Sequence, residues 1–227
     1  FSGFPLRRVN IDFFDNVPVL SFRKEPLKDN LSRLSKRIFD ILFSCLVIIV
    51  ILSWMYPLLA LLIKISSKGP VLFKQKRSGL DNKEFLCYKF RSMSLSMDAD
   101  SKQATKDDSR VTAIGAFLRK TSLDEFPQFL NVFKGDMSVV GPRPHMLKHT
   151  EEYSELIKKY MVRQLVKPGI TGAAQIRGYR GETKELNDME GRVKWDVWYI
   201  ENWTFFLDIN IIFGTVFDFF KGDEKAY

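Results

Sequence analysis

The chain has 227 residues, which is enough for one domain with a small appendage. Lys and Arg outnumber Asp and Glu by 35 to 27, so the formal net charge is +8 and the sequence favours anionic partners such as acidic lipids or phosphorylated substrates. The basic residues are dispersed, which argues against nucleic acid as the partner. The 2 cysteines, Cys45 and Cys87, give neither a disulfide framework nor a metal-binding spacing.

The N-terminal segment differs in character from the rest of the chain. Residues 1–30 start with Phe1 and carry short mixed stretches without clear periodicity, and we interpret them as a connector from a missing upstream region. Residues 31–40 are amphipathic and basic, a pattern that is suited to a membrane surface.

An apolar run follows, Ile41–Ile63, with 23 residues and no charge. A helix of that length can cross a hydrocarbon core of about 30 Å, so a plain transmembrane helix is the simplest interpretation. Pro57, however, removes a backbone donor inside the run and strains the preceding turn. Basic residues, which mark the cytoplasmic face, occur on both sides of the run: Arg33, Lys36 and Arg37 before it, and Lys64, Lys68, Lys74, Lys76 and Arg77 after it. We therefore predict a re-entrant membrane helix over residues 31–68, broken at Pro57, in which Ser53 or neighbouring protein satisfies the freed backbone groups.

Residues 69–227 are predicted to form an α+β domain that is mostly helical. Two strands, at 70–79 and 83–93, are joined by a turn at Gly79–Asn82 and form a short β-hairpin. The other elements are, in chain order, an exposed polar loop at 94–110, a helix or strand at 111–121, a tight loop at 139–145, a helix at 148–164, a turn-rich loop at 166–172 and a helix at 182–203. The apolar segment 205–220 lies either on the bilayer as an interfacial helix, with Trp195, Trp198 and Trp203 near the headgroups, or in the core.

Two adjacent acids, Asp124 and Glu125, stand out in the stretch "TSLDEFPQFLNVFKGD". The structural interpretation is a helix cap. Ser122 and Glu125 have the spacing of a capping box, but Pro127 fits better at the third helical position, which makes Asp124 the N-cap of a helix over residues 126–133. Capping alone would be a sufficient reason for Asp124.

The same acids are also suited to phosphoryl chemistry. A carboxylate at a helix start, with Arg119 and Lys120 just before it, could attack a phosphorus atom covalently. Glu125 could hold Mg²⁺ or move a proton, and a cation between two repelling carboxylates is expected. Arg143, on the rigid "GPRP" loop, could clamp a phosphate with two hydrogen bonds.

Competing motifs give weaker signals. Asp98 and Asp100 form a D-x-D of the kind that holds a metal in many glycosyltransferases, but the motif is short and lies in a polar stretch. His145 and His149 are four residues apart and lack a third ligand, so a solvated helix start is favoured over a zinc site.

Several segments together resemble one known family, the bacterial sugar transferases, also called monotopic phosphoglycosyl transferases. They are "KRIFDILFS", the run with Pro57, "KGPVLFKQKRSG", "YKFRSM", "RVTAIGAFLRKTSLDEFPQFLNVFKGDMSVVGPRPH", "YMVRQLVKPGITGAAQIRGYRGET" and "WYIENWTFFLDINIIF", which cover roughly residues 33 to 213. The opening "FFDNVPVLSFRKEPL" is similar to the junction that precedes the catalytic module in long members, so the chain resembles the catalytic module alone.

The resemblance implies a reaction and a setting. A UDP-sugar gives its sugar 1-phosphate to undecaprenyl phosphate with release of UMP, as the first membrane step of capsule, exopolysaccharide or O-antigen assembly. Asp124 would be the nucleophile of an Asp–Glu pair that also binds Mg²⁺. The donor would contact Arg119, Arg143, Gln175, Arg177 and Arg180, with "QIRGYRGET" resembling the subgroup that transfers hexose 1-phosphate. Position 173 is Ala where many relatives carry a Trp, so the resemblance does not assign the residues of the sugar pocket.

The family resemblance also implies a location: the bacterial inner membrane, with a small membrane-associated catalytic domain on the cytoplasmic face. Long members tend to form homodimers, so a homodimer is a further expectation.

Two alternatives belong to other classes. A metal-dependent glycosyltransferase would use Asp98 and Asp100 and release UDP. A non-enzymatic membrane anchor would account for the charge and the apolar run, but not for two acids and Arg143 within twenty residues.

Overall fold

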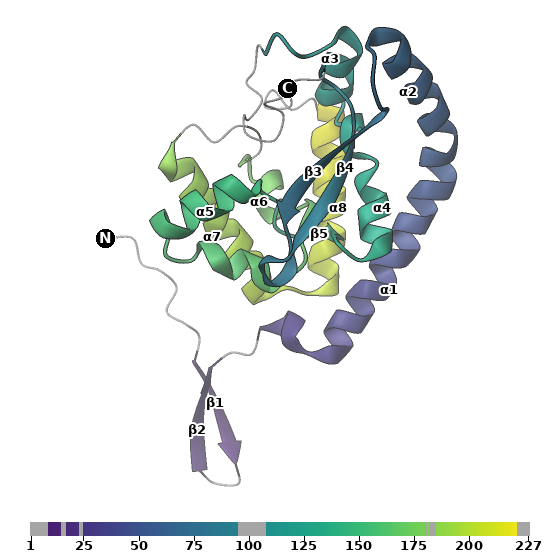
Figure 1. The fold of residues 1–227 in the computed structure, drawn as a ribbon. Helices are drawn as coiled ribbons and strands as arrows, with labels where there is room; N and C mark the ends of the chain where they lie inside the picture. Colours follow the sequence, from purple (N-terminus) through teal and green to yellow (C-terminus); the bar gives the residue numbers. More distant parts are fainter. Residues whose placement is uncertain are drawn as a thin grey trace.

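The structure is a computed structural model that describes residues 9–14, 17–22, 25–94, 108–179, 181 and 185–221. Helices predominate, and three two-stranded sheets accompany them (Figure 1). The elements in chain order are β1 (Val9–Phe14), β2 (Val17–Phe22), η1 (Pro26–Lys28), α1 (Asn30–Val47), η2 (Ile48–Leu52), α2 (Ser53–Ser66), β3 (Leu72–Ser78), η3 (Leu80–Asn82), β4 (Glu84–Phe90), α3 (Ala113–Lys120), η4 (Leu123–Glu125), α4 (Gln128–Lys134), β5 (Ser138–Val140), α5 (Leu147–Leu156), η5 (Tyr160–Leu165), β6 (Gly169–Thr171), α6 (Ala173–Ile176), α7 (Leu186–Asn202) and α8 (Phe205–Lys221).

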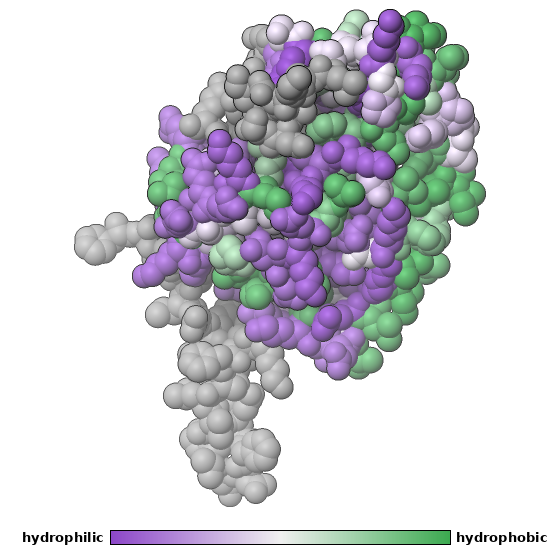
Figure 2. Space-filling model, viewed as in Figure 1, coloured by the Kyte–Doolittle hydropathy of each residue, from purple (hydrophilic) through white to green (hydrophobic). Residues whose placement is uncertain are grey.

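The apolar run belongs to one long helix, made of α1, η2 and α2. It starts where the Asp29 side chain accepts from the Ser32 N–H at 3.0 Å, which caps the first turn. Its 37 residues, Asn30–Ser66, form the one helix in the described part that is long and apolar enough to cross a membrane. Only 28% of the most apolar stretch of this helix is buried inside the protein. The helix bows around one side of the domain, and hydrophobic side chains line its outer edge (Figures 1 and 2).

The predicted break at Pro57 is wrong in form, because the helix continues through that residue. The irregularity lies upstream, in the π-helical segment Ile48–Leu52, where the Ser53 N–H bonds to the Ile48 carbonyl. The Ser53 hydroxyl donates to the Ile49 carbonyl at 2.6 Å, and the Trp54 indole donates to the Val50 carbonyl at 2.9 Å. These side chains satisfy carbonyl groups of the wider turn, so the chain bends without leaving the helix.

The β-hairpin at residues 70–93 is confirmed. β3 and β4 pair in antiparallel register from Leu72 with Phe90 to Ser78 with Glu84. Its turn contains Asp81 and Asn82 at φ of 52° and 59°, a conformation that Asp and Asn tolerate better than most residues. The Asn131 side chain of α4 accepts from the Tyr88 N–H at 3.0 Å and donates to the Leu86 carbonyl at 2.7 Å, which fixes α4 against β4.

Each of the two predicted loops includes a short strand. The loop at 139–145 begins within β5, and the loop at 166–172 contains β6. β5 and β6 pair in parallel, and the Gly169 N–H donates to the Pro142 carbonyl at 2.9 Å. A Cβ at Gly169 would collide with the backbone of Gly141, so glycine is required for this close approach. The pairing holds the start of the loop at residues 141–145, which we call the Arg143 loop, against a second strand.

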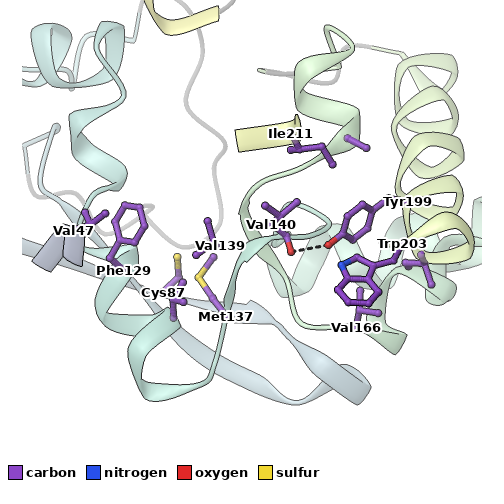
Figure 3. Close-up of a cluster of buried hydrophobic side chains, with 13 residues drawn as sticks. Val47, Cys87, Phe129, Met137, Val139, Val140, Val166, Tyr199, Trp203 and Ile211 are labelled. Atoms are coloured by element: carbon purple, nitrogen blue, oxygen red, sulfur yellow. Dashed lines mark hydrogen bonds between the residues drawn. The ribbon is translucent and has the colours of Figure 1, made fainter. Parts of the chain in front are cut away.

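The helical predictions in the C-terminal half are confirmed with changes at their ends. The 111–121 segment is helical, as α3. The predicted helix at 148–164 is divided into α5 and η5, and the helix predicted at 182–203 is α7. The core that these elements cover contains Val132, Met137, Val140 and Ile200, each fully buried. Figure 3 shows Met137 and Val140 in this cluster.

The last helix, α8, combines the two interpretations of segment 205–220. Asp208 and Ile211 are buried in the core, whereas Phe206, Phe213 and Phe217 are more than two-thirds exposed. Trp203 is buried and donates to the Asp208 carboxylate at 3.1 Å, so its predicted place at the headgroups is wrong. Trp203 lies in the core and not at the headgroups because the buried Asp208 carboxylate accepts the hydrogen bond of its indole N–H.

Buried polar contacts attach the long helix to the rest of the domain. The Lys36 ammonium lies 2.6 Å from the Asp208 carboxylate of α8 and 3.0 Å from the Tyr199 hydroxyl of α7. One turn further, the Asp40 carboxylate accepts from the Ser138 hydroxyl at 3.0 Å and the Val139 N–H at 2.9 Å. The helix is therefore joined to β5, and through β5 to the Arg143 loop.

Candidate active site

The acid pair lies in a tight turn between two helices. α3 ends at Lys120, Ser122 adopts a left-handed conformation with φ of 52°, and Asp124 and Glu125 then form the 3₁₀ turn η4. α4 begins only at Gln128. The prediction that Asp124 caps this helix is wrong, because the chain enters α4 through bonds of the 3₁₀ type such as Phe126 N–H to the Leu123 carbonyl, and Asp124 lies inside that turn. Helix capping therefore does not explain why an aspartate occupies position 124.

Glu125 is held by two cations. Arg143 donates to both of its carboxylate oxygens, at 3.1 and 2.6 Å, and the Lys89 ammonium lies 2.7 Å from one of them. Burial alone would raise the pKa of Glu125, but the charges and hydrogen bonds of Arg143 and Lys89 hold it well below its ordinary value. Glu125 is therefore ionised. Its Oε1 accepts two hydrogen bonds, whereas Oε2 accepts one, from Arg143, and so keeps a second lone pair for a further ligand.

The pKa of Asp124 is shifted in the opposite direction. Its side chain is buried, and among the described residues no group donates a hydrogen bond to its carboxylate. Burial raises the pKa of Asp124 to about 6, against the lowering effect of the Lys89 charge, and the negative charge of Glu125 adds to the rise. Asp124 is thus a mostly ionised, poorly solvated carboxylate at neutral pH, which is the state that favours attack on an electrophile.

The basic residues around the pair include one that the sequence analysis did not single out. Lys89 comes from β4, 36 residues before Glu125. The only sequence indication that Lys89 belongs to the site is that it lies in the "YKFRSM" segment, which resembles the family. That segment does not distinguish Lys89 from its neighbours. Arg119 lies at the end of α3, and its charge lowers the pKa of Asp124. Asp124, Glu125, Arg143 and Arg119 are therefore brought together as expected.

The other predicted donor residues lie on neighbouring elements. Gln175, on α6, donates to the Ile170 carbonyl at 3.2 Å, while its buried side-chain oxygen has no hydrogen-bond partner among the described residues. The Arg177 guanidinium lies over the Trp195 ring, 4.7 Å from its centre. In the described part neither residue bonds to the acid pair. Arg180 lies outside the described residues, as do Asp98 and Asp100, the acids of the competing motif.

The residues present fit a magnesium ion that shares its coordination with a substrate. No cluster of three or more His, Cys, Asp or Glu side chains occurs in the part of the chain that the structure describes. Mg²⁺ is commonly held by one or two carboxylates together with substrate phosphates, and next to Glu125 Asp124 offers a carboxylate that accepts from no donor in the described part. His145 is buried among arginines and is no metal ligand in this arrangement.

Comparison with known proteins places this site in a family. The sequence profile of the bacterial sugar transferases matches residues 31–222. The chain is 51% identical to a UDP-glucose:undecaprenyl-phosphate glucose-1-phosphate transferase of Klebsiella pneumoniae, over 94% of this chain and 45% of that protein. It is 48% identical to the protein of the same name from Escherichia coli, over 99% of this chain and 48% of that protein. A third, from Caulobacter vibrioides, is 40% identical over 91% of this chain and 78% of its own length.

The chain spans about half the length of the first two relatives. The family match nevertheless covers the acid pair, Lys89, Arg143 and the long apolar helix together. By that match, this chain belongs to the bacterial sugar transferase family.

Proposed function

We propose that this chain transfers a sugar 1-phosphate from a UDP-sugar to undecaprenyl phosphate and releases UMP. The names of the three relatives support the reaction class and favour glucose as the sugar to test first. The observation that carries the proposal is the asymmetry of the acid pair: Glu125 is neutralised by Arg143 and Lys89, whereas Asp124 is buried, lacks a donor in the described part and has a raised pKa.

The chemistry would proceed in two displacements. An Asp124 oxygen attacks the sugar-bearing phosphorus of the donor, the new oxygen–phosphorus bond forms, and the diphosphate bond breaks so that UMP leaves with the bridging oxygen and its electron pair. A phosphate oxygen of undecaprenyl phosphate then attacks the same phosphorus, which releases the Asp124 carboxylate and forms the lipid diphosphate sugar. Each step forms and breaks one bond at phosphorus, so no oxidant or further reactant is needed.

The neighbouring side chains would stabilise charge during these steps. Lys89 and Arg119 bring positive charge to Asp124 and to the phosphates that approach it. Glu125 keeps Arg143 in place through two hydrogen bonds, so the guanidinium is oriented before the donor binds. Mg²⁺, held by Asp124 and Glu125 with the donor, would neutralise charge that develops on the leaving UMP.

The long helix would place this site at the membrane. Its outer face exposes Leu42, Ile49, Trp54 and Leu61, each by more than half. Both ends are basic, which supports a re-entrant path over residues 31–68 with residues 69–227 on the cytoplasmic face of the inner membrane. The exposed phenylalanines of α8 would lie in the same interface. Cysteines introduced at residues 33 and 68, in a variant without Cys45 and Cys87, should both be protected from an impermeant label added outside; labelling of one flank alone would contradict the re-entrant path.

The nucleotide product tests the reaction directly. Purified protein in detergent is given UDP-glucose, undecaprenyl phosphate and Mg²⁺, and the released nucleotide is separated by chromatography. UMP supports the proposal, and Asp124→Asn should abolish it. UDP as the product would overturn it in favour of a glycosyltransferase that uses Asp98 and Asp100. If no nucleotide is released from any of a panel of UDP-sugars, the proposal fails and the non-enzymatic membrane anchor is the remaining hypothesis.

A further inference from the structure

His145 ends the Arg143 loop (residues 141–145) and lies deep in the domain. It is 7% exposed, and its carbonyl accepts from the Ser78 N–H at 3.2 Å. Its Nδ1 lies 2.6 Å from the Tyr160 hydroxyl. Burial lowers the pKa of His145 well below its ordinary value, and the charges of Arg163, Arg192 and Arg77 lower it further. The imidazole is therefore neutral.

Arginine groups lie on both sides of this imidazole. Arg163 Nη1 is 3.1 Å from Nδ1, and Arg163 Nη2 is 3.3 Å from Nε2. Arg192 Nη1 is 3.5 Å from Nε2. Arginine can only donate hydrogen bonds, so a charged histidine here would have no acceptor to offer it. In the neutral tautomer whose Nδ1–H donates to the Tyr160 hydroxyl, Nε2 is the one acceptor, and both Arg163 Nη2 and Arg192 Nη1 donate to it. The imidazole thus joins the two arginines through Nε2.

Each arginine holds a different loop. Arg163 Nη2 donates to the carbonyl of Arg143 at 2.9 Å, and its Nε lies 2.7 Å from the Asp196 carboxylate of α7. Arg163 therefore fixes the backbone of the phosphate-clamping Arg143 against α7.

Arg192, also on α7, donates to the carbonyls of Tyr179 and Gly181 at 3.1 and 3.0 Å. We call residues 177–179 and 181 the Tyr179 loop. A Cβ at Gly191 would collide with the Tyr179 ring, so the loop packs directly on α7. The loop follows α6, and in the part of the chain that the structure describes the Gln175 side-chain oxygen has no hydrogen-bond partner.

The charge of this network points to an anionic ligand. Among the described residues, Asp196 is the only carboxylate that bonds to it, and Asp196 pairs with Arg163. Burial and the charges of Arg143 and Arg163 lower the pKa of Arg192 to about 10, so it stays protonated at neutral pH. A small cavity that is lined by Arg143, His145, Tyr160 and Arg163 lies against the network. Buried, unmatched positive charge is costly, and an anion bound nearby offsets that cost.

We infer that His145 is a positioning residue that joins the Arg143 loop to the Tyr179 loop, so that both loops hold the diphosphate of the donor together. This inference rests on the proposed function for the identity of the donor. It assigns to His145 no contact with the reacting atoms. Without the imidazole, each loop is still held to α7, one through Arg163 and Asp196 and the other through Arg192, but the direct link between the two arginine side chains is lost.

The test compares His145→Phe with His145→Gln, which keeps an acceptor oxygen. The matched control is His149→Phe, the same change at the other histidine, which lies on α5 without a hydrogen bond to either arginine. UDP affinity, measured by titration calorimetry in detergent, needs no turnover. Loss of a hydrogen bond to a charged group predicts that His145→Phe weakens UDP binding and raises KM for UDP-glucose by about tenfold or more, with a smaller change in kcat. His145→Gln should stay within about threefold of the wild type.

Three results would overturn the inference: unchanged UDP affinity in His145→Phe, an equal loss in His149→Phe, or no UDP binding by the wild type. If His145→Phe does not fold, Arg192→Lys replaces it, since lysine keeps the charge but cannot bridge the Tyr179 and Gly181 carbonyls, and the same loss of UDP affinity is expected. If the wild type binds UDP but releases no UMP from any UDP-sugar, the proposed function fails, and the affinity comparison still decides the role of His145.

Discussion

Replacing either acid of the pair by its amide should change the stability of the protein in opposite directions. The pKa of Asp124 rises from 3.8 to about 6 in the folded protein, so ionising this carboxyl opposes folding. A difference of about two pH units corresponds to about 3 kcal/mol of unfolding free energy, which we take as an upper bound. Asp124→Asn should therefore raise the melting temperature at pH 8, by several degrees at most.

The pH dependence fixes the sign of this effect. A carboxyl with a raised folded-state pKa costs no stability when it is protonated, and the cost develops as the pH rises from about 4 through 6. The advantage of Asp124→Asn over the wild type should therefore be present at pH 8 and shrink toward zero at pH 4.5.

Glu125→Gln should have the opposite effect. The ionised Glu125 pairs with Arg143 and Lys89, and its lowered pKa means that it stabilises the fold at neutral pH and loses this contribution only as the pH falls toward its low folded-state pKa. Breaking a buried pair of this kind costs about 3–5 kcal/mol, because the partner charges stay behind. The melting temperature should fall at pH 8.

Thermal unfolding in detergent, followed by tryptophan fluorescence without nucleotide or Mg²⁺, measures both effects. Glu201→Gln, at an exposed position of α7, is the matched control and should leave the melting temperature unchanged. The reasoning is refuted if both amides shift the melting temperature in the same direction, or if the gain of Asp124→Asn is as large at pH 4.5 as at pH 8.

Three further outcomes are expected. UMP release in the donor half-reaction, measured without acceptor so that no lipid phosphate titrates, should fall below pH about 6 as Asp124 becomes protonated. Lys89→Met should move this fall in activity to higher pH, because it removes a charge that favours the carboxylate. A fall that stays at the same pH in Lys89→Met would contradict this. Chelation of divalent ions should stop UMP release in the nucleotide assay, and added Mg²⁺ should restore it; full activity in chelator would remove the metal from the account. Lys36→Met should lower the melting temperature, because it leaves Asp208 buried without its cation, and the loss should reach about 3–5 kcal/mol; a shift no larger than that of an exposed lysine variant would contradict it.

The parts of the fold that depend on local pattern were predictable. The hairpin follows from two alternating segments around Gly79–Asn82, and the long helix follows from the uncharged run Ile41–Ile63. The form of the helix was not predictable in the same way. Pro57 signals an irregularity, but the irregularity lies in the turn before it, where the Ser53 and Trp54 side chains donate to the Ile49 and Val50 carbonyls, and the helix continues through Pro57.

The site was predictable only where its residues are close in sequence. Glu125 and Arg143 are 18 residues apart, and both were candidates from their residue types and local context. Their pairing was not predicted, because Arg143 was expected to clamp a phosphate, and the structure shows that it donates to both oxygens of Glu125. Lys89 reaches Glu125 across 36 residues because α4 is fixed against β4, and no local pattern contains that contact. The capping prediction for Asp124 failed because spacing alone does not distinguish a 3₁₀ turn from the first turn of an α-helix.

The central claim is that Asp124 forms the covalent intermediate, and trapping that intermediate tests it most directly. Protein incubated with UDP-glucose and Mg²⁺ without acceptor is quenched in acid, digested and analysed by mass spectrometry. We predict a hexose phosphate adduct on the peptide that carries Asp124, absent in Asp124→Asn and lost when undecaprenyl phosphate is added before quenching. An adduct on Glu125, or UMP release by Asp124→Asn at the wild-type rate, would contradict the account.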